Sequence, residues 1–416
     1  MTRFLLRVAL TACFAFALAG CGTPFAIPSA TEAGSGPEAG TRTGTPAALS
    51  TAEPGTPRLL RLWLPSDFDP DAETASARIL KARLDLFASV HPEIMLDIRV
   101  KDRTGPARLL EMLALARAAA PESLPDLVAL PREDVEDAAL KGIIHPIDGL
   151  TAVLDDPGWY SYSRQLGHVQ NSAYGLPFAG DALVLAYDPT RYATPPQDWN
   201  AILKRPGALA LTGDTPHVLF LISLYRSMNG GLLDEQNHPL LEAFALQPTL
   251  EIVERARINR SLFVSSEEAA WQELLAGRAA WTVTTVTRVL ADPSERFQVI
   301  PLPGLNSDPF TLATSWTWVL AGADPQNEPL AIELADWLVQ DEFLNAWVNA
   351  AGYLPTRSAD ANERFPALSV VAESAQPVPS NDLLAALEPV LQAAASRILG
   401  GEAVETVVQD AIDALQ

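Results

Sequence analysis

The chain has 416 residues, and its 51 acidic residues outnumber its 29 lysines and arginines, which gives a formal net charge of −22 and a pI near 4.6. Its four lysines are scattered: Lys81, Lys101, Lys141 and Lys204. This composition argues against a nucleic-acid-binding function, because recognition of phosphates needs clustered basic residues, and it equally disfavours binding to an anionic membrane surface.

The amino terminus has the three zones of a secretory signal. Arg3 and Arg7 precede an apolar run of roughly a dozen residues, shorter than the about 20 that a membrane-spanning helix needs. The stretch Leu18-Ala19-Gly20-Cys21 resembles the lipobox of bacterial lipoproteins, in which the signal is cut before the cysteine and lipid is joined to the cysteine sulfur. We expect a signal peptide over residues 1–20 and lipidation of Cys21. An ordinary cleaved signal and an uncleaved anchor helix are the alternatives.

Residues 21–57 are expected to form a disordered tether. After Cys21 this segment consists almost wholly of Gly, Thr, Pro, Ala, Ser and Glu, so it has too little apolar surface to offset its ordering entropy. Cleavage would remove Cys13 and leave one cysteine, which excludes an internal disulfide. The remaining roughly 360 residues suffice for about two domains.

The first part of the expected folded region alternates strands and helices. The patterns predict strands at 58–65, 94–100 and 125–131. A helix beginning near Asp69-Pro70, a helix around residues 109–116 and a helix ending at Gly142 follow these strands in turn. This order predicts a mostly parallel sheet that is covered on both faces.

The later part of the chain continues the α/β pattern. It predicts strands at 182–188, 208–214, 278–285, 296–304 and 314–323, and helices at 216–229, 239–258, 266–276, 328–351, 381–398 and 402–415. The predicted fold class is therefore α/β throughout, with enough residues for two lobes.

The sequence lacks the common catalytic and metal-binding motifs. It has no P-loop, HExxH, CxxC or GxSxG pattern, and its five histidines are far apart. The acidic stretch "SDFDPDAE" lacks the Gly and Glu of a calcium loop, because Ala72 and Arg78 stand at those positions. Its acids are expected to cap the following helix instead. We predict no cofactor, no metal and no enzymatic activity, although carboxylates brought together in space would keep catalysis open.

Five segments resemble the extracellular solute-binding proteins of ABC transporters, in the maltose- and sugar-binding-protein-like group. Their order and spacing match that family over most of residues 58–416. The segments are "YGLPFAGDALVLAYDPT", "TPPQDWNAIL", "SLYRSMNGGLLDEQNHPLL", "SSEEAAWQELLAGRAAWTV" and "TSWTWVLAGADPQNEPLAIELADWLVQDEFLNAWVNAAGYLPTR".

The resemblance implies a two-lobed periplasmic-binding-protein-like fold of type II, with a ligand cleft between the lobes. By this likeness lobe 1 comprises residues 58–178 and 303–352, and lobe 2 comprises residues 183–299 and 353–416. The chain would cross a hinge at 177–182 and 299–303, with a last pass at Gly352–Pro355. Two strand edges that face each other would form the cleft.

The candidate ligand-binding residues follow from the same resemblance and from the chemistry of sugars, which need hydrogen-bonding groups and aromatic faces. They are Ser66, Asp67, Asp181, Thr215, His217, Trp281, Thr285, Arg288, Trp316 and Tyr353. Several have structural alternatives: Asp67 and His217 as residues at helix starts, Asp181 as a hinge hydrogen-bond acceptor, and Trp281 as a packed strand residue. Trp318 is placed either beside Trp316 or in the core.

The function implied by the resemblance is capture of a small polar solute by a lipid-anchored, extracytoplasmic bacterial protein. The solute would be a mono- or oligosaccharide, delivered by a monomer to the transmembrane subunits of an ABC importer. The aliphatic stretch "DLLAALEPV" argues against a long maltodextrin. A sensor-type receptor on the same fold, a carrier of a non-sugar solute, and a surface glycan-active enzyme are the alternatives.

Overall fold

The structure is a computed structural model that describes residues 57–105, 108–212, 215–306, 308–322, 324–358 and 365–415, and only the backbone of residues 215–217. The predicted signal peptide, Cys21 and nearly all of the predicted tether lie outside the described residues. No helix within the described ranges is long and apolar enough to cross a membrane.

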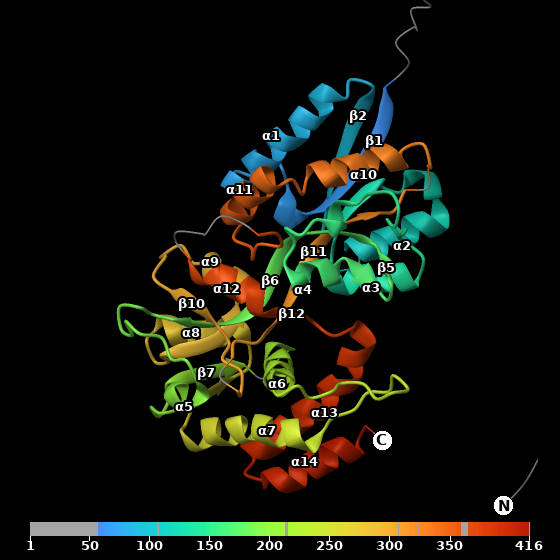
Figure 1. The fold of residues 1–416 in the computed structure, drawn as a ribbon. Coiled ribbons are helices and arrows are strands. Elements are labelled where there is room, and N and C mark those ends of the chain that lie inside the picture. Colours follow the sequence, from blue (N-terminus) through green and yellow to red (C-terminus); the bar gives the residue numbers. More distant parts are fainter. Residues whose placement is uncertain are drawn as a thin grey trace, which may run out of the picture. The chain divides into compact units, whose positions relative to one another are not determined.

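The first strand group consists of β1 (Arg58–Pro65), β2 (Ile94–Lys101) and β3 (Leu127–Pro131). These strands are parallel, in the order β2-β1-β3, which confirms the predicted β-α-β-α-β arrangement. Helices α1 (Ala75–Val90), α2 (Leu109–Ala119) and α3 (Arg132–Leu140) alternate with them. Figure 1 shows α1 and α2 on different sides of these strands.

The predicted start of the first helix is wrong. Ser66–Phe68 forms a short 3₁₀ turn, η1, and α1 begins only at Ala75. The cap is the Thr74 hydroxyl, which accepts the Ala77 N–H at 3.1 Å, so the preceding acids do not supply it. Asp67 lies in this turn, two residues after the end of β1 and well before α1.

Two long strands, β6 (Gly175–Tyr187) and β11 (Thr311–Leu320), lie in the middle of the sheet (Figure 1). β11 pairs antiparallel with β3 on one side and with the first part of β6 on the other. From Leu183 onward β6 pairs instead with β9 (Trp281–Thr285), and β10 (Gln298–Pro301) pairs with the same part of β6. A single strand therefore belongs to both parts of the sheet.

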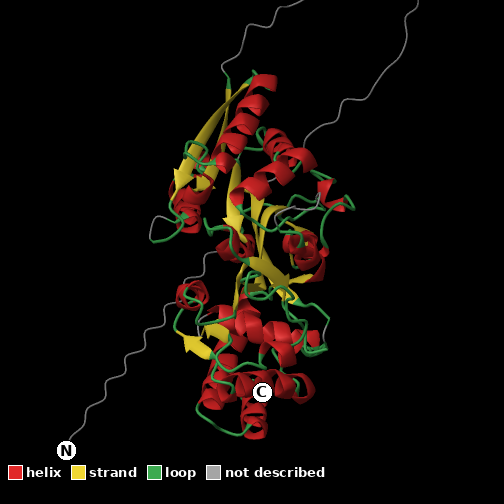
Figure 2. Cartoon of the chain, turned by 90° about the vertical axis from the view of Figure 1, so that its left-hand side faces the viewer, coloured by secondary structure: helices red, strands yellow, loops and turns green. Residues whose placement is uncertain are grey.

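The second strand group consists of β9 with β7 (Leu209–Thr212) and β8 (Leu262–Val264), which are parallel. The short strand β12 (Ala375–Pro377) pairs with β11, and β4 (His168–Val169) pairs with β5 (Ser172–Ala173). The remaining helices of this region are α4 (Ser161–Leu166), α5 (Trp199–Ile202), α6 (Thr215–Ser227), α7 (Ala243–Ile258), α8 (Glu267–Leu275), α9 (Val286–Leu290), α12 (Ala367–Ser374), α13 (Asn381–Leu399) and α14 (Val404–Asp413). Figure 2 shows the strands running between layers of helices.

The predicted helix over 328–351 is two helices, α10 (Glu328–Trp337) and α11 (Asp341–Ala351). In a continuous helix the Trp337 carbonyl would accept a backbone N–H four residues later. It instead accepts two hydrogen bonds from the Arg83 guanidinium, at 2.7 Å and 3.2 Å. Gln340 then takes an extended conformation. Contacts from α1 thus replace the backbone bonds that a continuous helix would make.

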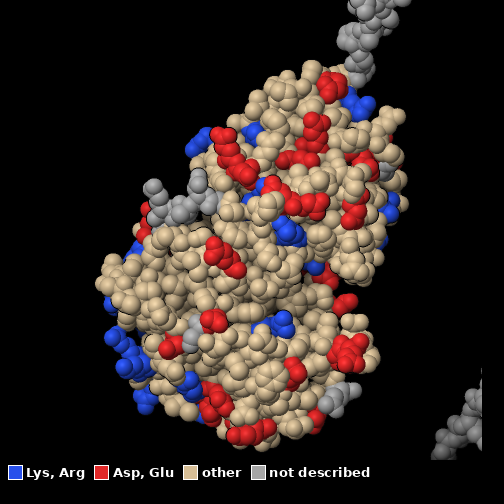
Figure 3. Space-filling model, viewed as in Figure 1, with Lys and Arg blue, Asp and Glu red and all other residues tan. Residues whose placement is uncertain are grey.

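The hydrophobic core follows the two strand groups. Around β1, β3 and β11, buried clusters lie on both faces, one with Leu62 and Phe87 and one with Val128 and Leu113. The carboxyl-terminal helices α13 and α14 pack instead with α6 and α7 beside the second strand group. On the face seen in Figure 3, acidic side chains are scattered among uncharged atoms, as expected for a solvated acidic surface.

Candidate ligand-binding site

The carboxyl ends of the first strand group meet at one edge of the sheet, where a cavity of about 380 Å³ opens. Asp67 follows β1, Arg103 follows β2, and Glu133 follows β3 at the start of α3, and all three line this cavity. A volume at the lower end of the about 300–1,000 Å³ typical of ligand sites fits a small ligand.

The central strands supply the second side of the cavity. Asp181 on β6 lies opposite Thr314 on β11, and both face the cavity together with Trp316. Thr287, in the first turn of α9, completes this side. The cavity therefore draws on the first strand group, on the strands shared by both parts of the sheet, and on a helix that follows β9.

Tyr353 reaches the cavity because the segment after α11 runs alongside β6. Leu354 exchanges two backbone hydrogen bonds with Gly180, at 2.9 Å and 2.8 Å, which fixes its neighbour Tyr353 beside Asp181. Burial raises the pKa of the Tyr353 hydroxyl, and the nearby Asp67 and Asp181 carboxylates raise it further. The phenol is therefore neutral and able to donate a hydrogen bond at neutral pH.

Phe68 packs behind the two aromatic rings that line the cavity, those of Trp316 and Tyr353. Its buried ring makes edge contacts with Trp316 at 5.0 Å and Tyr353 at 5.8 Å between ring centroids. The Arg103 guanidinium lies 5.6 Å from the Trp316 ring centroid and bonds Asp67 at 3.1 Å. Trp318 is buried and stacks on Phe178 at 4.3 Å between ring centroids, so of the two positions left open by the sequence it takes the one in the core.

Asp181 lines the cavity and is also a structural acceptor. Its carboxylate accepts the Ala182 N–H at 2.9 Å, the Thr287 N–H at 3.1 Å and the Thr287 hydroxyl. Burial raises the pKa of Asp181 to about 6, although these hydrogen bonds oppose the increase. Asp181 therefore has both of the roles considered for it: it lines the cavity, and its hydrogen bonds link β6 to α9.

The structure brings together four of the residues selected from the sequence, Asp67, Asp181, Trp316 and Tyr353. Exposed Ser66 adjoins Asp67 but is not among the residues lining this cavity. Thr215 and His217 stand at the start of α6, and their side chains lie outside the described part of the structure.

Three further candidates already have structural partners. Trp281 packs against Tyr192 at 4.5 Å between ring centroids. The Thr285 hydroxyl bonds Glu267 at 3.1 Å and caps α9. Arg288 pairs with Glu268 at 2.7 Å and lies 4.8 Å from the Trp271 ring centroid. None of the three lines the cavity.

Sequence reasoning missed Arg103, Glu133, Thr287, Thr314 and Ser315. Arg103 and Glu133 had a usable signal, because each closely follows a predicted strand of the parallel group. Thr287 had none, since its place depends on how α9 packs on β6. Within the described ranges, no group of three or more His, Cys, Asp or Glu side chains is arranged to hold a metal ion.

Comparison with protein families decides the assignment. The model of the bacterial extracellular solute-binding proteins matches residues 111–367, more than half of the chain. The chain belongs to this family. No curated protein sequence matches this solute-binding protein.

Solved structures of sugar-binding proteins are similar in fold. The cyclic alpha-maltosyl-1,6-maltose binding protein of Arthrobacter globiformis has a TM-score of 0.71 at 16% identity, covering 86% of this chain and 98% of its own. The sugar-binding protein MalE of Xanthomonas citri has a TM-score of 0.71 at 18% identity, covering 86% and 96%. UgpB of Mycobacterium tuberculosis, solved with glycerophosphocholine, has a TM-score of 0.65 at 15% identity, covering 87% and 98%. This solute-binding protein therefore has their two-lobed α/β fold.

Asp181 is expected to make the stability of the solute-binding protein depend on pH. Its folded-state pKa of about 6 exceeds the ordinary 3.8, so its contribution is fully present below about pH 4 and is lost as pH rises through 6. Between pH 4 and 7 the wild type should lose up to about 3 kcal/mol of unfolding free energy relative to Asp181→Asn. Chemical unfolding of both proteins across this range measures the difference, and parallel pH profiles would contradict it.

Proposed function

We propose that this solute-binding protein captures a mono- or oligosaccharide in the cavity beside Trp316 and delivers it to the permease of an ABC importer. The observation that carries the proposal is the composition of the cavity, where carboxylate and hydroxyl groups surround two aromatic rings. Sugars present hydroxyl groups and C–H faces that match these two kinds of surface. Several proteins with a similar fold are described as maltose- or maltodextrin-binding proteins, which supports this ligand class.

The mechanism we propose is closure of two lobes around the ligand. Lobe 1 comprises residues 58–178 and 303–352, lobe 2 comprises residues 183–299 and 353–416, and the crossings lie near 177–182, 299–303 and Gly352–Pro355. The switch of β6 from β11 to β9 after Ala182 supports the first crossing. A ligand that touches Glu133 in lobe 1 and Thr287 in lobe 2 favours the closed state through its greater affinity for that state.

The proposal extends to location and partners. A lipid on Cys21 would hold the monomer on the outer side of the bacterial membrane, and the permease and its ATPase would be separate chains. The protein would release its ligand unchanged, without catalysis. Replacing Cys21 by Ser should abolish incorporation of labelled lipid and release the protein into the medium or periplasm. Continued membrane attachment of that variant would contradict the lipid anchor.

A thermal-shift and calorimetry screen against mono- and oligosaccharides tests ligand capture. A sugar at 100 times its dissociation constant should add about 2.7 kcal/mol to the unfolding free energy. Thr314→Val removes a hydroxyl from the cavity while preserving shape, and it should weaken binding by roughly tenfold. The matched control is Thr406→Val on α14, where the side chain is exposed. Failure of every sugar to bind, or conversion of a bound sugar to product, would overturn the proposal.

A further inference from the structure

The charges that line the cavity are unbalanced. Three carboxylates, those of Asp67, Glu133 and Asp181, face one basic side chain, that of Arg103, among the described residues that line it. The Arg103 guanidinium is already engaged, because it bonds Asp67 at 3.1 Å. That pair is neutral as a unit, which leaves Glu133 and Asp181 without a cation inside the cavity.

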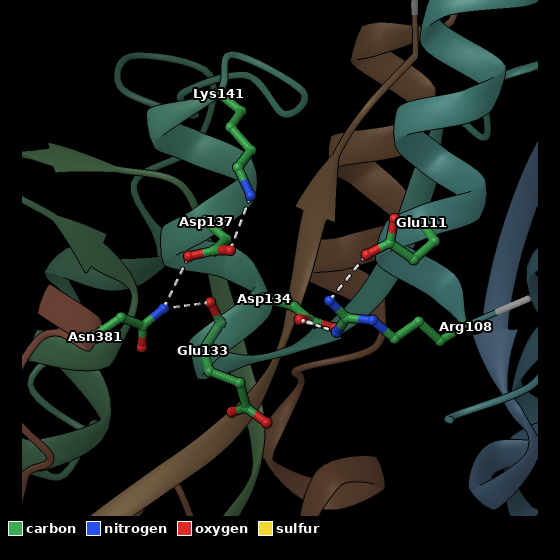
Figure 4. A network of polar contacts seen from close by, with 7 residues as sticks. All are labelled: Arg108, Glu111, Glu133, Asp134, Asp137, Lys141 and Asn381. Atoms are coloured by element: carbon green, nitrogen blue, oxygen red, sulfur yellow. Dashed lines mark hydrogen bonds and ion pairs between the residues drawn. The ribbon is translucent and has the colours of Figure 1, made fainter. Parts of the chain in front are cut away.

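Among the described residues, no basic side chain next to the cavity forms an ion pair with Glu133. Arg108 bonds Asp134 at 2.8 Å and Glu111 at 3.2 Å, as Figure 4 shows, and Arg132 approaches Glu136 at 3.5 Å. Each of these guanidinium groups pairs with another carboxylate, and Arg132 attracts the neighbouring Glu133 carboxylate only through space.

The Glu133 carboxylate takes no part in the polar network around α3. Its backbone carbonyl accepts the Asn381 amide at 2.8 Å, whereas its exposed side chain points away from this contact (Figure 4). Within the described part of the chain, that side chain makes no hydrogen bond or ion pair. Since Asn381 bonds the backbone, replacing the Glu133 carboxylate leaves the network intact.

Asp181 is held by neutral donors alone. The Ala182 and Thr287 N–H groups and the Thr287 hydroxyl satisfy its oxygens, but none of them carries a charge. Burial raises the pKa of Asp181, and the nearby Glu267 carboxylate raises it further. The aromatic rings of Trp316 and Tyr353 line the same cavity, and ring faces attract cations.

We propose that the ligand of this cavity carries a protonated amine, as an amino sugar does, with the amine directed to Glu133 and Asp181. This inference rests on the proposed function, because it takes the cavity to be the ligand site. A neutral sugar would use the two carboxylates as hydroxyl acceptors and would leave both without an ion-pair partner. An ammonium group would form charge-assisted hydrogen bonds with them, which are shorter and stronger than neutral ones.

The test is calorimetric titration of the folded chain, slightly below neutral pH, with three matched sets of sugars. Glucosamine, galactosamine and the glucosamine disaccharide are each compared with the neutral hydroxyl parent and with the N-acetylated form, which keeps the skeleton but lacks the charge. An amino sugar should bind at least about tenfold more tightly than both neutral counterparts. Putrescine and spermidine form a separate arm, which distinguishes an amino sugar from an aliphatic polyamine.

Two variants locate the effect. Glu133→Gln and Asp181→Asn should each lower the preference for the amine by about tenfold, and affinity for the amine should fall with added salt. Glu405→Gln, at an exposed position on α14, is the matched control and should leave the preference unchanged.

The outcomes separate this inference from the proposed function. Equal binding of an amino sugar and its neutral parent, or a preference for neutral sugars, overturns the charge inference and leaves sugar capture standing. Polyamine binding without any sugar binding supports the charged ligand and overturns sugar as its class. Absence of binding in every arm overturns both.

Discussion

Replacing Phe68 by Ala is expected to destabilise the protein by about 3–5 kcal/mol and to weaken ligand binding by at least about tenfold. The ring is buried, with 3% of its surface exposed, and it contacts Phe178, Trp316, Trp347 and Tyr353 at centroid distances of 5.0–5.8 Å. Its removal leaves a void beneath the two rings that line the cavity, so both rings lose their support.

A second buried phenylalanine separates the two effects. Phe87 on α1 is fully buried but contacts His91 and Trp337, which are not among the residues lining the cavity. Phe87→Ala should cost a similar unfolding free energy while leaving the dissociation constant near the wild-type value. Chemical unfolding and calorimetry on both variants provide the comparison. Equal losses of affinity in the two would show that binding follows global stability rather than the position of Trp316 and Tyr353.

Replacing Gly180 by Ala is expected to cost about 2–5 kcal/mol of unfolding free energy. A Cβ at this position would lie 2.2 Å from the Tyr162 hydroxyl oxygen and 2.8 Å from the Leu354 carbonyl oxygen. The tyrosine would have to move and abandon its 2.7 Å hydrogen bond to the Pro355 carbonyl. The segment that carries Tyr353 would be displaced as well, so ligand affinity should fall together with stability.

A double variant identifies the clash as the cause. Tyr162→Phe removes the hydroxyl that the new methyl group would meet, so its cost and that of Gly180→Ala should be clearly less than additive. The coupling free energy comes from unfolding curves of the two single variants and the double variant. Additive costs would mean that the Tyr162 hydroxyl is not what excludes a side chain at Gly180.

The sequence allowed much of the fold to be predicted because its strongest patterns are local. Alternation and helical periodicity located β1, β2, β3 and most helices. The division between α10 and α11 was not accessible in this way, because the Arg83 side chain that bonds Trp337 lies 254 residues earlier in the chain. No window of neighbouring residues contains that information.

The residues of the site also divide into those that the sequence could identify and those that depend on packing. Asp67 could be selected because it closely follows a predicted strand, and Asp181 because the family likeness points to it. Glu133 satisfied the same strand-end rule as Asp67. Trp281 illustrates the limit: an aromatic residue on a strand is equally suited to a ligand face and to a core. Its contact with Tyr192 decides the matter, and that contact depends on the packing of a loop after β6. Side-chain type alone does not determine which face is buried.

The place of β11 in the sheet has a consequence for how the chain is made. This strand lies between β3 and β6, yet it begins at Thr311, long after β3 has ended at Pro131. During synthesis the edges of β3 and β6 that pair with β11 stay unpaired until most of the polypeptide has emerged. Pairings between such distant segments form slowly. A polypeptide that acquires its central strand so late is slow to complete its sheet during translation, a property that would suit the export proposed above.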